Sequence, residues 1–325
     1  MKEFLIRSEM LEVKFLDLGG RITSITSPHY EGNLVLSYPE RVSNDGNYTF
    51  PSAMYLSDNN YLGAIAGRYA NRIANGAFTL EGTEYALDKN DNGINCLHGG
   101  VAGYDKRVFN VDCSYSSALL TLFDGEGIFP GNADAAIRYS VTGSSLMIRY
   151  LVKTDRPTVI NLTNHTYFNP NGNINDCEVR FDADYYTPVD KKMIPTGEIK
   201  SVLSTPFDFR EYKKIGRDIN CGDEQLKIAD GFDHNFVING GGLRKAAQVY
   251  MPATSLTLTV TTDMPGFQFY TGNFLREPFM KREGFCLETQ YYPDTPNKPN
   301  FPPCVAAPGK PFRSKTIYTF SQDKQ

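Results

Sequence analysis

The stretch SLTLTVTTD, residues 255–263, alternates apolar and polar side chains with a period of two. Leu256, Leu258 and Val260 fall on one face of an extended chain, and threonines fall on the other. Successive side chains of a β-strand point to opposite faces, whereas a helix repeats every 3.6 residues. The stretch therefore predicts a β-strand with one buried face.

Other parts of the chain carry related patterns. Residues 145–154 alternate in the same way, with Leu146 and Ile148 on one face. The stretch GAFTLEGTEYAL, residues 76–87, predicts a hairpin that turns at Glu81-Gly82, because glycine suits tight turns. A second hairpin is expected within residues 122–136. The chain is thus expected to be rich in antiparallel strands.

Helix is expected to be a minor component, because no long run has helical period; the best short candidates are Tyr69–Asn75 and Phe209–Ile215. Twenty-eight glycines and nineteen prolines interrupt short extended runs, and no linker divides the chain. We therefore expect a single all-β domain over residues 1–325. The proline-dense segment 291–303 is flanked by aromatic residues and is expected to be an ordered loop packed on the sheet.

Composition argues against several classes of partner. A net charge of -4 offers no broad positive surface for nucleic acid or for an anionic membrane. Charged residues interrupt residues 1–15, so no signal peptide is expected, and no apolar run is long enough to span a membrane. The six cysteines lack CxxC spacing and are expected to be buried free thiols. These features predict a soluble, cytoplasmic protein.

Three of the four histidines, His98, His165 and His234, lie in polar segments; His29 is expected to be structural. The spacing predicts no metal site, since no HxH, HExxH or Cys/His pair occurs. No GxGxxG or GxxxxGK[ST] motif indicates a nucleotide cofactor, and no GxSxG motif indicates a nucleophilic serine. Acid–base chemistry on a neutral polar molecule is the class of reaction that remains.

Further polar side chains fit such a molecule, although each alone also fits a structural role. In GFCLETQYY, residues 284–292, alternation makes Glu288 project from a strand. Arg72 and Asn71 offer donors and acceptors for sugar hydroxyls, and Asp233 can accept from a pair of them. Gln268 stands between aromatic residues that are expected to cover an apolar sugar face.

Taken together, these segments resemble the aldose 1-epimerase, or galactose mutarotase, family in order and in detail. The similar segments are LDLGGRITSITSP (16–28), GRYANRIANG (67–76), NCLHGG (95–100), GYDKR (103–107), NLTNHTYFN (161–169), DGFDHNF (230–236), PGFQFYTGNF (265–274) and LETQYYPDTPNKPNFP (287–302). The family often has a leucine and a tryptophan where this chain has Pro170 and Phe109, which puts the pocket rim and sugar preference in doubt.

The resemblance implies an antiparallel galactose mutarotase-like β-supersandwich with few short helices. It also implies that Glu288 is the general base and His165 the general acid of an isomerase that interconverts the anomers of free aldoses. By the same resemblance, Asn71, Arg72, His98, Asp233 and Gln268 hold the sugar. No cofactor or metal is implied, and the chain is expected to be a monomer or a homodimer.

The implied chemistry opens a cyclic hemiacetal. The base removes the proton of the anomeric hydroxyl while the acid protonates the ring oxygen. We expect an ionised Glu288 and a protonated His165, acting from opposite sides of the ring, and a kcat that falls on the alkaline side. Three rivals are a non-catalytic sugar-binding protein, a glycoside hydrolase using Asp233 and Glu288, and an epimerase of phosphorylated sugars.

Overall fold

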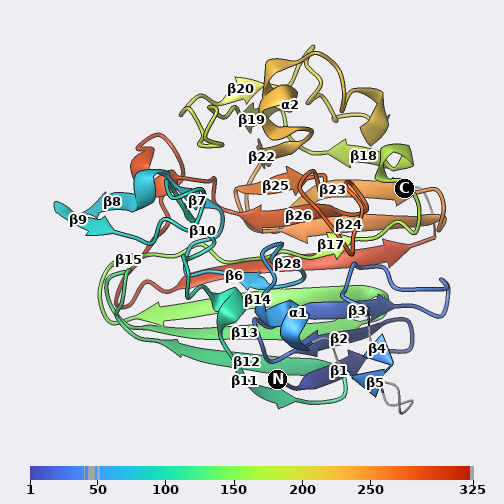
Figure 1. Cartoon of the computed structure of the whole chain (residues 1–325), viewed down its shortest axis with the longest axis horizontal. Helices are drawn as coiled ribbons and strands as arrows, with labels where there is room; N and C mark the ends of the chain where they lie inside the picture. The colour runs from blue at the N-terminus through green and yellow to red at the C-terminus, as the bar shows by residue number, and fades with distance from the viewer. Residues whose placement is uncertain (40, 43–47, 50–51, 323–325) are drawn as a thin grey trace.

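The computed structural model describes residues 1–39, 41–42, 48–49 and 52–322 (Figure 1). Most elements in these ranges are β-strands, and the α-helices are only α1 (Ser52–Leu56) and α2 (Glu224–Ala229). The prediction of an all-β fold is therefore confirmed. No helix in the described part of the chain has the length and apolar character needed to cross a membrane.

Two antiparallel sheets dominate. The larger, in spatial order, contains β11 (Asn110–Cys113), β12 (Ser117–Asp124), β13 (Ala133–Thr142), β14 (Ser145–Thr154), β28 (Phe312–Ser321), β24 (Leu256–Thr262), β23 (Arg244–Met251), β18 (Glu178–Phe181) and β21 (Lys213–Lys214). The smaller contains β17 (Tyr167–Phe168), β26 (Phe285–Gln290), β25 (Gly266–Tyr270), β22 (Asp233–Val237), β19 (Tyr185–Thr187) and β20 (Lys200–Ser201).

Smaller sheets surround these two. One has three strands: β1 (Glu3–Arg7), β2 (Glu12–Leu16) and β3 (Ile22–Thr26). The two-stranded pairs are β4 (Arg41–Val42) with β5 (Tyr48–Thr49), β6 (Ile65–Ala66) with β16 (Thr163–Asn164), β7 (Arg72–Ile73) with β10 (Cys96–Leu97), β8 (Ala77–Leu80) with β9 (Thr83–Ala86), and β15 (Thr158–Val159) with β27 (Val305–Ala306). Figure 1 shows the β8–β9 hairpin projecting at one side of the molecule.

The strand and hairpin predictions are confirmed. Strand β14 spans the expected residues 145–154, and β24 buries Leu256, Leu258 and Val260. The β8–β9 hairpin turns at Glu81 and Gly82, whose φ angles are 50° and 80°. Two central residues with positive φ are typical of a turn that matches the twist of the flanking strands. The second hairpin joins β12 to β13.

The core lies between the two large sheets. Phe181 of β18 packs edge-on against Phe236, Phe267 and Phe269 of the smaller sheet, with ring centroids 4.9, 5.0 and 5.1 Å away. The Tyr318 hydroxyl of β28 donates to the Leu287 carbonyl at 3.3 Å. Burying one such aromatic side chain contributes roughly 1.5–3 kcal/mol, so this layer holds the smaller sheet in place.

Both short helix candidates are wrong. Within Tyr69–Asn75, Arg72–Ile73 form strand β7, and Asn71 and Asn75 adopt left-handed φ angles of 64° and 56° that a helix does not tolerate. Within Phe209–Ile215, Lys213–Lys214 form strand β21 beside β18. The signal for α2 was its N-cap, where the Asp223 carboxylate accepts the amides of Gln225 and Leu226.

The cysteine prediction is partly wrong. All six cysteines are free, and Cys96, Cys177, Cys286 and Cys304 are buried. Cys113 is exposed and Cys221 is only partly buried. Cys113 lies in β11, which is the edge strand of the larger sheet. Burial therefore depends on the place of a cysteine in the sheet, which spacing does not report.

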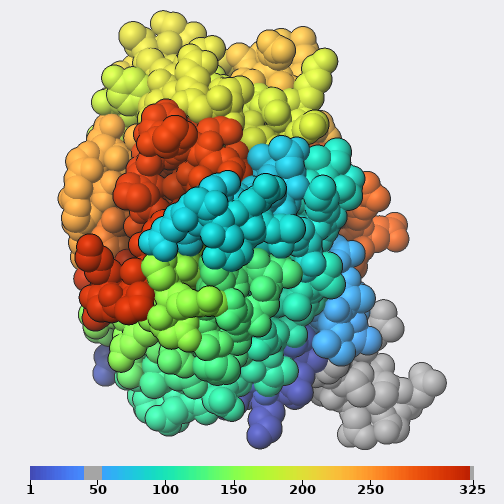
Figure 2. Space-filling view, turned by 90° about the vertical axis from the view of Figure 1, so that its left-hand side faces the viewer, coloured from blue at the N-terminus to red at the C-terminus, as the bar shows by residue number. Residues whose placement is uncertain are grey.

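The proline-dense segment 291–303 packs against the β8–β9 hairpin, as Figure 2 shows for the red and cyan segments. Asp294 is fully buried and accepts hydrogen bonds from the Ala74 amide at 2.9 Å and from Asn297 Nδ2 at 2.7 Å. Asn297 also donates to the Ala77 carbonyl of β8 at 3.0 Å. The prediction of a loop packed on neighbouring strands is confirmed.

Candidate active site

The smaller sheet has one apolar and one polar face. In β26, Phe285 and Leu287 point into the core, so Glu288 points to the other side. The register of β26, β25 and β22 pairs Glu288 with Gln268, and Gln268 with Asn235. Opposed residues in antiparallel strands share a face, and Asp233 lies two residues from Asn235. Strand pairing therefore places Glu288, Gln268 and Asp233 on one face.

His165 reaches the same face from the segment between β16 and β17. Its amide donates to the Ala64 carbonyl at 2.8 Å, and its carbonyl accepts the Gly63 amide at 3.0 Å. The backbone is thus held on both sides of the side chain. Nδ1 lies 3.5 Å from the Cys286 sulfur, which leaves Nε2 directed toward Glu288.

The Nε2 atom of His165 lies 3.7 Å from Oε1 of Glu288, and the two side chains are only 6% and 2% exposed. That separation is longer than a hydrogen bond and too short for a sugar ring to lie between the groups. The expected placement on opposite sides of a ring is therefore not the arrangement of the empty site. They can instead reach two neighbouring oxygens from one side.

His98 is clamped by the backbone of Asn71. The Asn71 amide donates to His98 Nδ1 at 3.2 Å, and the His98 amide donates to the Asn71 carbonyl at 3.1 Å. The pairing of β7 with β10 brings these two turns together. The His98 and His165 ring centroids are 5.2 Å apart. His98 therefore presents Nε2 beside the His165–Glu288 pair.

Arg72, Asp233 and Gln268 form the polar surroundings. Arg72 Nε donates to Asp91 Oδ2 at 2.9 Å, and both side chains are largely buried. Gln268 Nε2 donates to Asp233 Oδ1 at 2.7 Å. Gln268 does not line the open part of the site. Its hydrogen bond orients the Asp233 carboxylate instead.

A hollow with a cavity volume of ≈ 130 Å³ gathers six of the seven predicted residues. Its polar lining suits a small polar ligand. The lining residues are Asn59, Asn60, Tyr61, Asn71, Arg72, Leu97, His98, His165, Tyr167, Asp233, Tyr270, Phe274 and Glu288.

Burial controls the charges of the central pair. It raises the pKa of Glu288 well above its usual value, with a further increase from the Asp233 charge and an opposing effect of Arg72. Burial lowers the pKa of His165 to about 4, while its own backbone and Asp58 oppose that shift. Both shifts favour the neutral forms of the two groups, which are a protonated Glu288 and an unprotonated His165. Burial thus opposes the charges expected for the complex with sugar, an ionised Glu288 and a protonated His165, which stay a prediction.

Three groups come close enough to hold a metal ion, although their sequence spacing predicted none. His98, His165 and Glu288 each offer one ligand atom within 4.8 Å of the others. Burial also lowers the pKa of His98 well below its usual value, so its ring is neutral. Because Nδ1 of His98 accepts the Asn71 amide, the ring proton is on Nε2. In that form His98 presents a donor, which suits a hydroxyl oxygen better than a metal.

The aromatic residues that flank Gln268 were predicted to cover a sugar face, and this prediction is wrong. Phe267 and Phe269, which flank Gln268, point into the core because they alternate with it. Tyr61, Tyr167, Tyr270 and Phe274 line the hollow instead. Tyr270 was detectable as Gln268's same-face neighbour at i+2, whereas Tyr61 belongs to no motif.

The remaining residues of interest lie away from the hollow. Phe109 is buried in the core beside Tyr104, with centroids 6.1 Å apart. Neither Phe109 nor Pro170 lines the hollow, so their effect on its rim is not direct. His234 points to the apolar side against Phe207, with centroids 4.7 Å apart, and no role in the site is assigned to it. His29 is exposed.

Comparison with known proteins agrees with this fold. A family model described as aldose 1-epimerase matches residues 2–319. Galactose mutarotase from Bos taurus is 38% identical over 342 residues, which cover 99% of this chain and 94% of that protein. Aldose 1-epimerase from Escherichia coli (strain K12) is 39% identical over 278 residues, or 80% of each chain. The crystal structure of galactose 1-epimerase from Lactobacillus acidophilus NCFM superposes with a TM-score of 0.84 and 27% identity over 99% of both chains.

The fold and these comparisons define a β-sandwich isomerase. The chain belongs to the aldose 1-epimerase family.

Proposed function

We propose that this chain is a mutarotase that interconverts the α and β anomers of free aldoses such as galactose or glucose. The observation that carries the proposal is the 3.7 Å separation of His165 Nε2 and Glu288 Oε1. In a pyranose the anomeric hydroxyl oxygen and the ring oxygen are bonded to the same carbon, C1. Two proton-transfer groups that are close together without bonding to each other fit two such oxygens.

In the proposed cycle Glu288 is the general base at the C1 hydroxyl and His165 is the general acid at the ring oxygen. Removal of the hydroxyl proton and protonation of the ring oxygen break the bond between C1 and that oxygen, which leaves an open-chain aldehyde. Rotation about the C1–C2 bond presents the other face of the aldehyde. The same proton transfers in reverse close the opposite anomer, so the protein ends the cycle unchanged.

This cycle requires one transferable proton in the pair, and ring opening requires that proton on His165. Burial opposes this arrangement in the empty site, because it raises the pKa of Glu288 and lowers that of His165. Arg72 lowers the pKa of Glu288, and Asp58 raises that of His165. Both charges therefore favour the working arrangement, and moving the proton between the partners changes no net charge in the buried site.

The remaining site residues are proposed to hold the sugar. His98 Nε2–H donates to a hydroxyl oxygen, and Arg72 supplies further fixed donors. Asp233 accepts from a pair of hydroxyls, and Gln268 keeps its carboxylate oriented. The Asn71 side chain lines the same hollow and can both donate and accept.

The proposal is tested by polarimetry on freshly dissolved α-galactose and α-glucose, with and without protein. We expect the optical rotation to approach its equilibrium value faster with the protein, and not with the same preparation after heat denaturation. No acceleration with any aldose would overturn the proposal. Addition of a nitrophenyl galactoside distinguishes a glycoside hydrolase, which would release nitrophenol.

We further propose that residues 1–325 form one domain, since the family model extends over residues 2–319. A cytoplasmic location, the lack of binding to nucleic acid, and a monomeric or homodimeric state remain predictions. Light scattering on the purified protein measures the last of these directly.

A further inference from the structure

Tyr61 adopts an unusual backbone conformation at the wall of the hollow. Its φ angle is 55°, in the left-handed region that side chains other than glycine rarely occupy. Asn71 and His98 at the same site have φ angles of 64° and 51°, but asparagine and histidine tolerate this region better than tyrosine does. Strain of this kind persists only where surrounding contacts enforce it, and it often marks a functional residue.

The contacts that enforce it come from one carboxylate. Asp58 Oδ1 accepts the Asn60 amide at 2.9 Å, and Asp58 Oδ2 accepts the Leu62 amide at 2.8 Å. These two amides flank Tyr61 in the chain. The Tyr61 carbonyl in turn accepts the Ala64 amide at 2.9 Å. The Asp58 side chain therefore closes the turn that holds Tyr61 in its left-handed conformation.

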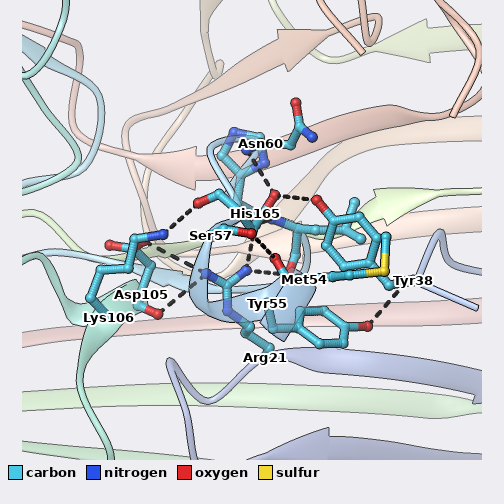
Figure 3. Close-up of polar contacts among 12 residues, drawn as sticks. Arg21, Tyr38, Met54, Tyr55, Ser57, Asn60, Asp105, Lys106 and His165 are labelled. Carbon is cyan, nitrogen blue, oxygen red and sulfur yellow. Dashed lines mark hydrogen bonds and ion pairs between the residues drawn. The ribbon is translucent and has the colours of Figure 1, made fainter. Parts of the chain in front are cut away.

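Asp58 is itself held by buried partners. Arg21 Nη1 donates to Asp58 Oδ2 at 2.7 Å, and both side chains are 0% exposed. The Tyr38 hydroxyl donates to Asp58 Oδ1 at 2.8 Å. Figure 3 shows Arg21 at the base of this network, with Tyr38 on one side, Asp105 on the other, and His165 above. A buried ion pair is a weak source of stability, which favours a positioning role for it.

The Tyr61 side chain reaches both histidines of the site. Its ring centroid is 4.4 Å from that of His98 and 5.9 Å from that of His165. The ring lines the hollow, and Asn90 Nδ2 lies 3.4 Å from the Tyr61 hydroxyl. An aromatic face in this position can cover the C–H face of a sugar that the histidines hold by its oxygens.

We infer that Tyr61 is a further sugar-contacting residue of this site and that Asp58 is the residue that positions it. The inference rests on the proposed function.

The first test replaces the ring and keeps the backbone. Tyr61→Asn suits the left-handed conformation and removes the aromatic face. We expect it to raise KM about three- to tenfold with a smaller change in kcat, whereas Tyr61→Phe keeps KM near that of the parent. Glu81→Asn is the matched control, because Glu81 also has positive φ, at 50°, but lies in the β8–β9 turn. An unchanged KM in Tyr61→Asn would overturn the contact.

The second test is a double-mutant cycle with Asp58→Asn. If Asp58 acts through Tyr61, Asp58→Asn raises KM in the parent and causes no further increase in Tyr61→Asn. An equal increase in both backgrounds would show that Asp58 does not position Tyr61. If Asp58→Asn does not fold, Tyr38→Phe takes its place, since it removes a single hydrogen bond to Asp58. A parent protein inactive on every aldose would refute the proposed function instead.

Discussion

His165 Nε2 and Glu288 Oε1 lie 3.7 Å apart in a buried site, without a hydrogen bond between them. Among the described residues, the second carboxylate oxygen of Glu288 has no hydrogen-bond partner either. Buried polar atoms are normally paired, so this carboxyl group is free to engage a ligand at low cost in lost contacts.

Replacing Glu288 by glutamine removes the proton-transfer group and leaves a neutral side chain of similar size. Because burial already favours the neutral acid, we expect Glu288→Gln to change the free energy of unfolding by no more than about 1 kcal/mol. Mutarotation should fall at least about 100-fold. Polarimetry and urea unfolding measure the two effects. Glu84→Gln, at an exposed position of β9, is the control and should behave as the parent.

Replacing His165 by asparagine should cost at least about 100-fold in rate for the same reason. If the two groups act as one unit, the double variant Glu288→Gln/His165→Asn loses no more activity than the more damaged single variant. Polarimetry on all three variants measures the coupling. Fully additive losses would indicate that His165 and Glu288 work in separate steps.

The pH dependence of kcat/KM should be bell-shaped, because the pair needs one proton in total. At low pH His165, with a pKa of about 4, takes up a second proton and no base remains. At high pH Glu288, whose pKa is raised well above its usual value, loses the shared proton and no acid remains. The alkaline decline expected from the sequence is retained, but it is assigned to the pair and not to the histidine alone.

The neighbouring charges should move the alkaline limb in opposite directions. The Asp233 charge raises the pKa of Glu288, so Asp233→Asn should shift the limb to lower pH. Arg72 lowers that pKa, so Arg72→Met should shift the limb to higher pH. The midpoint of the alkaline limb is read from the pH profile of kcat/KM. The weaker sugar binding that is also expected lowers the height of that profile and does not move its midpoint. Shifts of the same sign in both variants would contradict this electrostatic account.

Acid should destabilise the protein through buried neutral histidines. Burial lowers the pKa of His234 from 6.5 to about 3. A group with a lowered folded-state pKa contributes stability above its unfolded pKa, and that stability is lost as pH falls toward the folded value. His234→Gln should therefore reduce the loss of unfolding free energy between these pH values by up to about 1.4 kcal/mol per pH unit. Urea unfolding across that pH range measures the slope of unfolding free energy against pH. The same slope in the variant and the parent would refute this role of His234.

The sequence was sufficient wherever a pattern is local. Alternation along 255–263 and 145–154 predicted β24 and β14, because the two faces of a strand alternate whatever the strand pairs with. Alternation also placed Glu288 on the face away from Leu287. The family motifs then predicted the seven site residues, of which six line one hollow and Gln268 supports Asp233. Local patterns failed for Tyr69–Asn75, where long-range pairing with β10 overrides helical tendency.

Only the tertiary structure decided which side chains meet and in which direction their pKa values shift. The antiparallel pairing of β17 with β26 opposes Tyr167 to Cys286 and so brings His165 to 3.7 Å from Glu288, although the two are far apart in the sequence. Burial raises the pKa of Glu288 and lowers that of His165. The sequence does not report these shifts, because desolvation depends on every atom packed around a group and no single stretch of sequence specifies that packing. Tyr61 likewise joins the site through contacts between distant segments. Arg21 holds Asp58, and Asp58 closes the turn that gives Tyr61 its left-handed conformation.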